Sequence, residues 1–192
     1  MTFERFPSSD NPLSSDIFLI KGASVNYVFD TGASSEAKEF LDSIPDKVVI
    51  LSHFHQDHSA NAKSITFRCL YGGKKTCDYL KIGTAVQDRI VLEEGLEISP
   101  LITCHAKGSL MLNLNHEYLF VGDALCGCAL PDGRYGYNAG MLLSTIRELE
   151  KEDFENAVES HSGKIIPKSQ VLGNLRTLYA KRNGNNPYIA EA

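Results

Sequence analysis

The sequence predicts an α/β fold in which β-sheets are covered by helices. Short apolar segments with strand patterning recur between residues 17 and 121, and segments with helical spacing lie towards both ends. No Pro-, Gly- or Ser-rich linker divides the 192 residues into two halves. Because sheets and helices bury their apolar faces by stacking in layers, we expect one compact domain over residues 1–192.

The first half of the chain is expected to alternate strands with helices. Apolar segments between turn residues predict four strands, at Ile17–Lys21, Ser24–Phe29, Lys47–Leu51 and Ile65–Leu70. The β-branched segment Lys47–Leu51 is typical of a strand buried on both faces. Helical spacing predicts two helices, over residues 34–43 with Ser34 or Ser35 as the cap, and over Gly73–Leu80.

The second half is expected to begin with strands and to end with helices. The predicted strands are Arg89–Leu92, Glu97–Thr103, Ser109–Asn113 and Tyr118–Val121. The Gly-rich segment Gly122–Gly140 has no clear period and is predicted to be a loop. The predicted helices are Ala139–Glu150, Glu152–Ala157 and Lys168–Arg182.

Composition narrows the classes of function. With 43% hydrophobic and 22% charged residues, the chain is not disordered, and a net charge of −5 argues against nucleic acid as a partner. The apolar stretches are too short to span a bilayer, and no secretory signal is visible, so we expect no membrane partner. Five cysteines, an odd number, favour reduced thiols and a cytoplasmic location.

A hexapeptide of histidine and aspartate follows the predicted strand Lys47–Leu51. It holds His53, His55, Asp57 and His58, and we expect it to form a turn whose side chains point in different directions around a small volume. Imidazole and carboxylate groups suit zinc and related divalent ions. A polar surface turn is the alternative, but three of the six histidines of the chain lie in this one segment.

Three further polar residues lie where apolar segments end. They are His105, Asp123 and His161. In α/β architectures such positions gather functional side chains. Considered alone, each of these residues is better explained as a hydrogen-bonded structural residue than as a metal ligand. Together with the hexapeptide they give five histidines and two aspartates, which is enough for two metal ions with a carboxylate between them. The sixth histidine, His116, is expected in a solvated hairpin turn.

These segments resemble the motifs of the metallo-β-lactamase superfamily, in the same order along the chain. The hexapeptide resembles the second motif, His105-x-x-Gly-Ser the third, Gly-Asp123 the fourth and His161-Ser-Gly the fifth. Phe-Asp30-Thr-Gly resembles the early turn whose aspartate is structural. The resemblance implies an αββα four-layer sandwich with the metal site at one edge of the two sheets.

The resemblance also implies the ligands. His53, His55 and His105 would hold a first metal, Asp57, His58 and His161 a second, and Asp123 would bridge the two. The cofactors would be two divalent ions, with Zn²⁺ favoured and Fe or Mn as alternatives. Asp57 and Asp123 would be the catalytic carboxylates, with a hydroxide bridging the metals as the nucleophile.

The expected reaction is hydrolysis of a small-molecule substrate, a thioester, ester or lactone. The pattern is similar to the glyoxalase II-like and lactonase-like branches. Two features depart from them: only about thirty residues follow His161, where glyoxalase II has a helical extension, and Cys126 stands where lactonases often have tyrosine. The sequence does not indicate the oligomeric state.

Four residues are candidates for substrate binding. They are Lys107, beside a predicted ligand, and Arg134, Tyr135 and Tyr137 in the loop after Asp123. Arg134 or Lys107 would anchor a substrate carboxylate or phosphate. A solvated loop over a packed aromatic ring is an equally good interpretation. The roles of Cys104, Cys126 and Cys128 stay open, with packing favoured.

Three rival functions fit parts of the pattern. An iron-dependent oxidoreductase similar to the persulfide dioxygenases would keep similar ligands. A phosphodiesterase or nuclease on the same scaffold is disfavoured by the acidic composition. A non-catalytic metal-binding module is disfavoured because every expected ligand is present.

Overall fold

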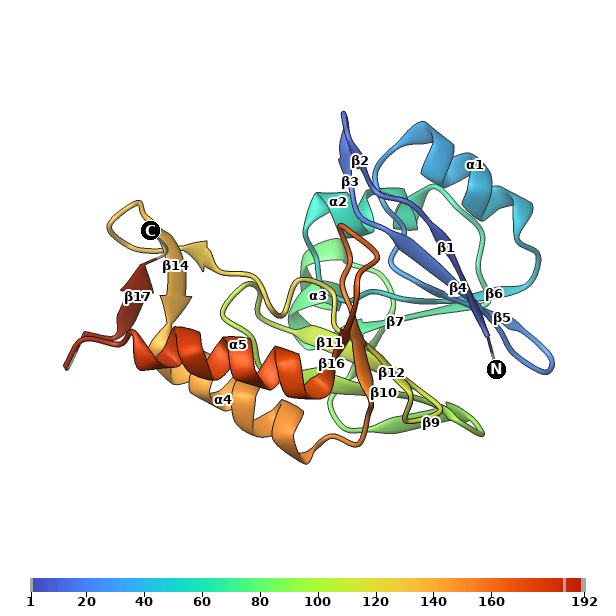
Figure 1. The fold of residues 1–192 in the computed structure, drawn as a ribbon. Helices are drawn as coiled ribbons and strands as arrows, with labels where there is room; N and C mark the ends of the chain where they lie inside the picture. The colour runs from blue at the N-terminus through green and yellow to red at the C-terminus, as the bar shows by residue number, and fades with distance from the viewer. Residues whose placement is uncertain (1, 185, 191–192) are drawn as a thin grey trace.

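Two six-stranded sheets form the centre of the molecule (Figure 1). The structure, a computed structural model, describes residues 2–184 and 186–190. The strands of the first sheet, in spatial order, are β1 (Phe3–Phe6), β4 (Ile17–Lys21), β5 (Asn26–Phe29), β6 (Lys47–Ile50), β7 (Cys69–Gly73) and β8 (Thr84–Val86). Those of the second are β16 (Ile165–Pro167), β15 (Asn156–Val158), β12 (Tyr118–Phe120), β11 (Ser109–Leu114), β10 (Leu96–Leu101) and β9 (Ile90–Glu93).

Helices and small sheets complete the fold. The helices are α1 (Ser35–Ser43), α2 (Gln56–Ser59), α3 (Lys74–Leu80), α4 (Ala139–Lys151) and α5 (Lys168–Ala180), with a 3₁₀ turn at Ala60–Lys63. The remaining strands are β2 (Ser9–Asp10), β3 (Leu13–Ser14), β13 (Cys128–Ala129), β14 (Tyr135–Asn138) and β17 (Tyr188–Ala190). No helix in the described part of the chain is long and apolar enough to cross a membrane.

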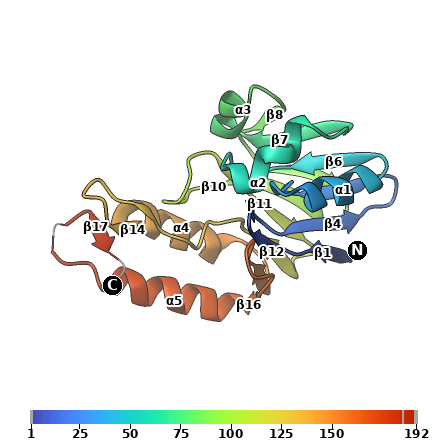
Figure 2. The ribbon, with the colours of Figure 1, turned by 90° about the horizontal axis from the view of Figure 1, so that it is seen from above.

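Alternation along the strands explains the layers. In β4, Phe18 and Ile20 belong to the core between the sheets, whereas Ile17 and Leu19 pack on the opposite face with Leu41 of α1. Helices α4 and α5 cover the outer face of the second sheet through a third apolar cluster (Figure 2). The order is therefore helix, sheet, sheet, helix, and the predicted fold class is confirmed.

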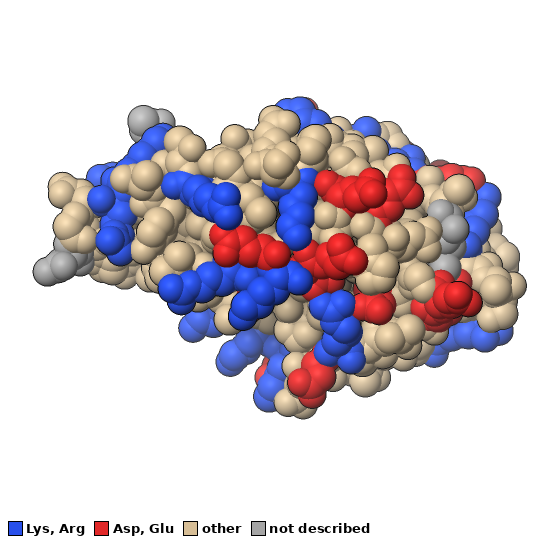
Figure 3. All heavy atoms as spheres, turned by 60° about the horizontal axis from the view of Figure 1, so that its bottom comes forward, with Lys and Arg blue, Asp and Glu red and all other residues tan. Residues whose placement is uncertain are grey.

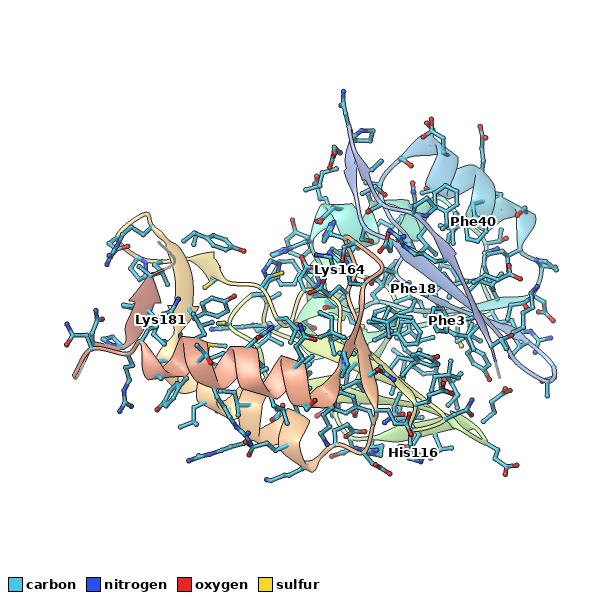
Figure 4. The ribbon with its side chains drawn as sticks, in the orientation of Figure 1. Phe3, Phe18, Phe40, His116, Lys164 and Lys181 are labelled. Atoms are coloured by element: carbon cyan, nitrogen blue, oxygen red, sulfur yellow. The ribbon has the colours of Figure 1, made fainter. Side chains whose placement is uncertain are left out.

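Aromatic rings fill the space between the two sheets. Phe3 and Phe18 lie side by side in Figure 4, with ring centroids 6.0 Å apart. Phe120 of the second sheet contacts both rings, at 5.0 and 4.9 Å. These contacts tie the N-terminal strand β1 to the core. No strand was predicted before Ile17, because the N-terminal residues are mostly polar.

Three other predictions about elements were wrong. Residues 152–157 do not form a helix: α4 ends at Lys151, and Asn156–Val158 pairs with β12 as a parallel strand because Ala157 and Val158 are buried in the sheet. The segment Gly122–Gly140 is not only a loop, since it contains β13 and β14, the second of which pairs with the distant β17. The strand predicted at Ile65–Leu70 begins only at Cys69.

The surface around α4 and α5 carries charges of both signs. Figure 3 shows basic and acidic side chains lying next to one another across the centre of this face. Among them, Arg176 of α5 forms an ion pair with Glu150 of α4 at 2.8 Å. Opposite charges at this distance cancel most of each other's field.

Candidate metal centre

The candidate ligands converge at one edge of the two sheets. His53 and His55 follow β6, and Asp57 and His58 lie on the short helix α2, so part of the hexapeptide is helical and not a simple turn as expected. His105, Asp123 and His161 follow β10, β12 and β15. Strand β6 runs parallel to β5, and β12 runs parallel to β15. The loops that follow these strands therefore leave the sheets at one edge, which brings the seven side chains together.

The first group of donors consists of three imidazoles, those of His53, His55 and His105. The Nε2 atom of His105 lies 3.0 Å from Nδ1 of His55. The ring of His53 is 4.5 Å from that of His55 and 5.1 Å from that of His105, between centroids. Only 1% of His53 is exposed, and its buried Nε2 atom has no hydrogen-bond partner in the described structure.

The second group contains Asp57, His58, Asp123 and His161. Nε2 of His161 lies 3.2 Å from Oδ2 of Asp57 and 3.5 Å from Oδ1 of Asp123. Asp123 reaches both groups, since its Oδ2 atom is 3.3 Å from Nε2 of His58 and 3.3 Å from Nε2 of His105. Its carboxylate therefore lies between the two groups.

These spacings fit donors arranged around cations. Two ligands, each about 2.1 Å from a tetrahedral ion, lie about 3.4 Å from one another. The four nitrogen–oxygen distances given above for the second group and Asp123 fall between 3.2 and 3.5 Å. Direct charge-assisted hydrogen bonds are shorter, at about 2.7–2.9 Å. The cluster is therefore able to hold divalent metal ions.

Hydrogen bonds around the cluster fix the tautomers of three histidines. Ser52 donates its hydroxyl to Oδ2 of Asp30 at 2.7 Å, so at 3.0 Å it accepts from Nδ1–H of His53. His58 donates Nδ1–H to the same Asp30 oxygen at 2.8 Å, and His105 donates Nδ1–H to the Gly127 carbonyl at 2.8 Å. All three rings therefore direct Nε2 at the cluster, which is how metal-ligating histidines are oriented.

The two groups differ in their protonation. Burial lowers the pKa of His53 well below its usual value and also lowers the pKa of His55. The pKa of His58 is raised to about 10, because Asp30 and Asp123 outweigh the opposing effect of burial, and hydrogen bonds to Asp123 and Asp57 raise the pKa of His161 to about 9. Although burial opposes it, the hydrogen bonds and charges of His161 and His58 lower the pKa values of Asp123 and Asp57.

Asp30 and Gly122 shape the buried support beneath the cluster. Asp30 is fully buried and also accepts the Ser52 backbone N–H at 2.7 Å. Its φ of 62° lies in the left-handed region, where aspartate and asparagine are tolerated. Gly122 has φ +55°, and a Cβ there would lie 2.6 Å from Cβ of Ser52. The chain therefore needs glycine beside Asp123.

Replacing Asp30 by asparagine is expected to lower metal affinity about 10–100-fold, as is typical of a group that orients metal ligands. Asparagine suits the left-handed backbone, but its amide nitrogen would face a donor, because the carboxylate now accepts from the Ser52 amide, the Ser52 hydroxyl and His58. Competition with a chromophoric chelator measures the affinity. Asp42→Asn, at an exposed ion pair with Lys38, is the control. Equal affinities in the two variants would contradict the role of Asp30.

The N-terminal segment holds the loop that carries His161, a support that the sequence analysis missed. Arg5 forms an ion pair with the buried Asp16 at 2.9 Å, and the Asp16 backbone N–H donates to the Ser160 carbonyl at 2.6 Å. Ser8 donates its hydroxyl to the carbonyl of His161 at 2.9 Å. The two aromatic residues of Phe-Glu-Arg-Phe, which are half-buried on opposite faces of the strand, were the available signal for it.

The four candidate substrate residues occupy different places. Lys107 lines a cavity that also has His105 in its wall. Arg134 is exposed and pairs with Asp132 at 2.6 Å. Tyr137 is buried in the core and donates its hydroxyl to the Leu125 carbonyl, and Tyr135 donates to the Gly127 carbonyl, the one that also orients His105. The structure thus brings Lys107 to the cavity and not Arg134, and places both tyrosine hydroxyls in structural hydrogen bonds.

His116 lies in solvent away from the cluster, whereas two cysteines lie beside it. His116 is exposed in the turn between β11 and β12, as expected, and Figure 4 shows it at the opposite end of these strands from Lys164, which lies on the His161 loop. Its Nδ1 is 3.7 Å from the Asp153 carboxylate. Cys104 and Cys128 line the cavity beside His105. His116 is thus outside the cluster.

Comparisons with known proteins agree with this fold. The metallo-beta-lactamase superfamily profile matches residues 10–69, a segment that includes the hexapeptide. No curated protein matches the chain. A mutant of a flavo di-iron protein from Thermotoga maritima has a TM-score of 0.68 and 18% identity over 89% of this chain, which spans 55% of that protein.

Two further solved structures match over most of their own length. An archaeal metallo-beta-lactamase superfamily protein from Sulfolobus tokodaii has a TM-score of 0.62 and 15% identity. The match covers 95% of this chain and 90% of the archaeal protein. A chemotaxis sensor described as a peroxy diiron species has a TM-score of 0.69 and 16% identity. The match covers 89% of this chain and 88% of the sensor chain. The profile therefore matches about a third of the chain, and the solved structures share its fold.

Proposed function

We propose that this protein is a metal-dependent hydrolase that cleaves a small ester, thioester or lactone. The observation that carries the proposal is the convergence of seven donors in two groups, with Asp123 between them and the buried Nε2 of His53 lacking a partner in the described structure. An unpartnered buried polar atom is costly, and a bound cation would remove that cost. The loops that follow four different strands bring these side chains together, so chance proximity explains the arrangement poorly.

Each group would hold one divalent ion. His53, His55 and His105 would bind the first ion and Asp57, His58 and His161 the second, with Asp123 in contact with both. The donor set favours Zn²⁺. When bound, such ions make water nucleophilic at neutral pH and polarise a carbonyl oxygen. The two groups of donors contain only histidine and aspartate, so water would be the nucleophile.

The residues of the cluster leave a path for substrate and water. His161 and Asp57 keep 33% and 17% of their side chains exposed, whereas His58 is fully buried. Asp57 is thus the carboxylate that lies beside incoming water. Because the pKa values of Asp57 and Asp123 are lowered, both remain carboxylates at neutral pH and hold cations in place.

An iron-dependent oxidoreductase is the second candidate function. The observation that favours it is the fold shared with a flavo di-iron protein and with a diiron chemotaxis sensor. Imidazole and carboxylate ligands suit iron as well as zinc. Bound metal identity separates the two candidates.

The test is hydrolysis by protein purified without added metal. The panel contains p-nitrophenyl esters, acyl thioesters, lactones and a phosphodiester, with and without chelator, and the bound metal is identified by mass spectrometry. We expect ester-class turnover that chelator abolishes and Zn²⁺ restores. His55→Ala should lose it, whereas His116→Ala, at an exposed histidine outside the cluster, should keep it. Turnover indifferent to chelator would overturn the proposal, and oxygen consumption with bound iron would replace it with the second candidate.

A further inference from the structure

A cavity of about 640 Å³ opens beside the candidate metal centre, with His105 in its wall. Its size falls in the range of small-molecule sites, about 300–1,000 Å³. Much of the lining is apolar. Phe54 and Tyr79 form an aromatic side, with ring centroids 5.0 Å apart. Ala129 of β13 and Met141 of α4 add to the apolar lining. Tyr79 is 61% exposed, which is unusual for an aromatic ring without a partner surface.

Two lysines line the same cavity, Lys75 at the start of α3 and Lys107 in the loop before β11. Their backbones are held together: Thr76 donates its hydroxyl to the Gly108 carbonyl at 3.0 Å, and a Cβ on Gly108 would lie 2.8 Å from Cβ of Lys75. Gly108 has φ +78°, so glycine permits both the backbone turn and the close approach.

Neither lysine forms an ion pair with a carboxylate in the described part of the chain. The charge of Lys75 nevertheless reaches Asp78, whose pKa is lowered by its hydrogen bond to Lys74 and, to a lesser extent, by the charges of Lys74 and Lys75. The one acidic residue in the cavity wall, Asp78, pairs with Lys74 at 2.9 Å. The cavity wall therefore carries two lysines against one aspartate, which itself pairs with Lys74 outside the lining, and this excess of positive charge attracts an anion.

We propose that this cavity binds an anionic substrate group through Lys75 and Lys107, with the apolar wall taking the chain that joins it to the scissile bond at the metal centre. The inference rests on the proposed hydrolase function and names its substrate class: small esters or thioesters that carry a carboxylate on an apolar acyl or alkyl chain. A phosphate has the same charge chemistry. Lys75 has no motif around it, and its place is set by the contact with Gly108, so sequence reasoning did not find it.

The experiment compares two esters of similar length that differ in charge. p-Nitrophenyl hydrogen glutarate carries a carboxylate, and p-nitrophenyl valerate is neutral. We expect the glutarate ester to have the lower KM. Lys75→Met and Lys107→Met should each raise that KM about tenfold, because each removes a charge-assisted contact, and should leave the KM of the valerate ester within about twofold. Lys38→Met, whose lysine forms an exposed ion pair with Asp42 on α1 and does not line the cavity, is the matched control.

A binding measurement separates this inference from the hydrolase function. Glutaric acid monoanilide, an uncleaved amide analogue, is titrated into wild-type and variant proteins and followed by calorimetry. Weaker binding in Lys75→Met and Lys107→Met, but not in Lys38→Met, supports the site even if no ester is cleaved. Cleavage of both esters with equal KM changes in all three variants would overturn the site and leave the hydrolase in place. Cleavage of neither ester by the metal-loaded protein would overturn the function itself.

Discussion

Asp123→Ala is expected to abolish hydrolysis and to lower the metal content of both groups. The Asp123 Oδ2 atom is 3.3 Å from Nε2 of His58 and 3.3 Å from Nε2 of His105, so one substitution removes a ligand from each side. Changes to groups that only orient ligands cost about 10–100-fold, and loss of a shared ligand should cost more than about 100-fold in turnover. Metal analysis by mass spectrometry and ester turnover, measured on the same preparation, test this prediction.

The control for this prediction is Asp153→Ala. The Asp153 side chain is 86% exposed and lies beside His116, outside the cluster. It should keep both the metal content and the turnover of the wild type. Circular dichroism spectra establish that both variants are folded. A folded Asp123→Ala protein that keeps two ions per chain and full turnover would show that the carboxylate does not lie between two metals.

Much of the cluster was predictable because each donor follows an apolar segment. His53 and Asp123 follow β6 and β12, two strands that local patterning predicts. His161 follows β15, which was predicted as part of a helix, but its position at the end of an apolar segment still marked it as a candidate. Their order along the chain then brought out the resemblance to a known superfamily. The αββα layers could be predicted for the same reason, since they depend on which face of each strand is apolar.

The errors have a common physical cause, which is pairing between distant segments. Residues 152–157 have helical composition, but Ala157 is buried between β12 and β16, and sheet pairing outweighs local propensity. Arg134 is close to Asp123 in sequence, yet its guanidinium pairs with Asp132 at the surface. Lys75 was missed for the opposite reason, since the contact with Gly108 joins residues more than thirty positions apart.

Metal binding at pH 7 is expected to release about two protons, both from the second group of ligands. The pKa of His58 is raised to about 10 and that of His161 to about 9, so both imidazoles carry a proton at pH 7 in the metal-free protein. A divalent ion binds only neutral imidazole, and each of these rings must therefore lose one proton. His53 and His55 have lowered pKa values and are already neutral.

The two ions should therefore differ in their dependence on pH. Affinity for the second ion should rise about 100-fold per pH unit between pH 7 and pH 9, as two protons are displaced, while affinity of the His53 and His55 group stays nearly constant. Calorimetric titrations in buffers of different ionisation enthalpy give the number of protons released. His161→Gln should reduce it by about one. Equal pH dependence of the two binding steps would contradict the assignment of the protons to His58 and His161.

The same pKa values predict how the stability of the metal-free protein changes with pH. A folded-state pKa above the ordinary histidine value of 6.5 adds stability that is fully present below pH 6.5 and is lost as pH rises through the folded pKa values, here about 9 and about 10. Urea unfolding of the metal-free protein should therefore show stability falling from about pH 7 to pH 10. The metal-loaded protein should lack this decline, because its ligands no longer hold those protons. A metal-free protein whose stability stayed constant over this range would show that Asp30, Asp57 and Asp123 do not hold His58 and His161 in the protonated form.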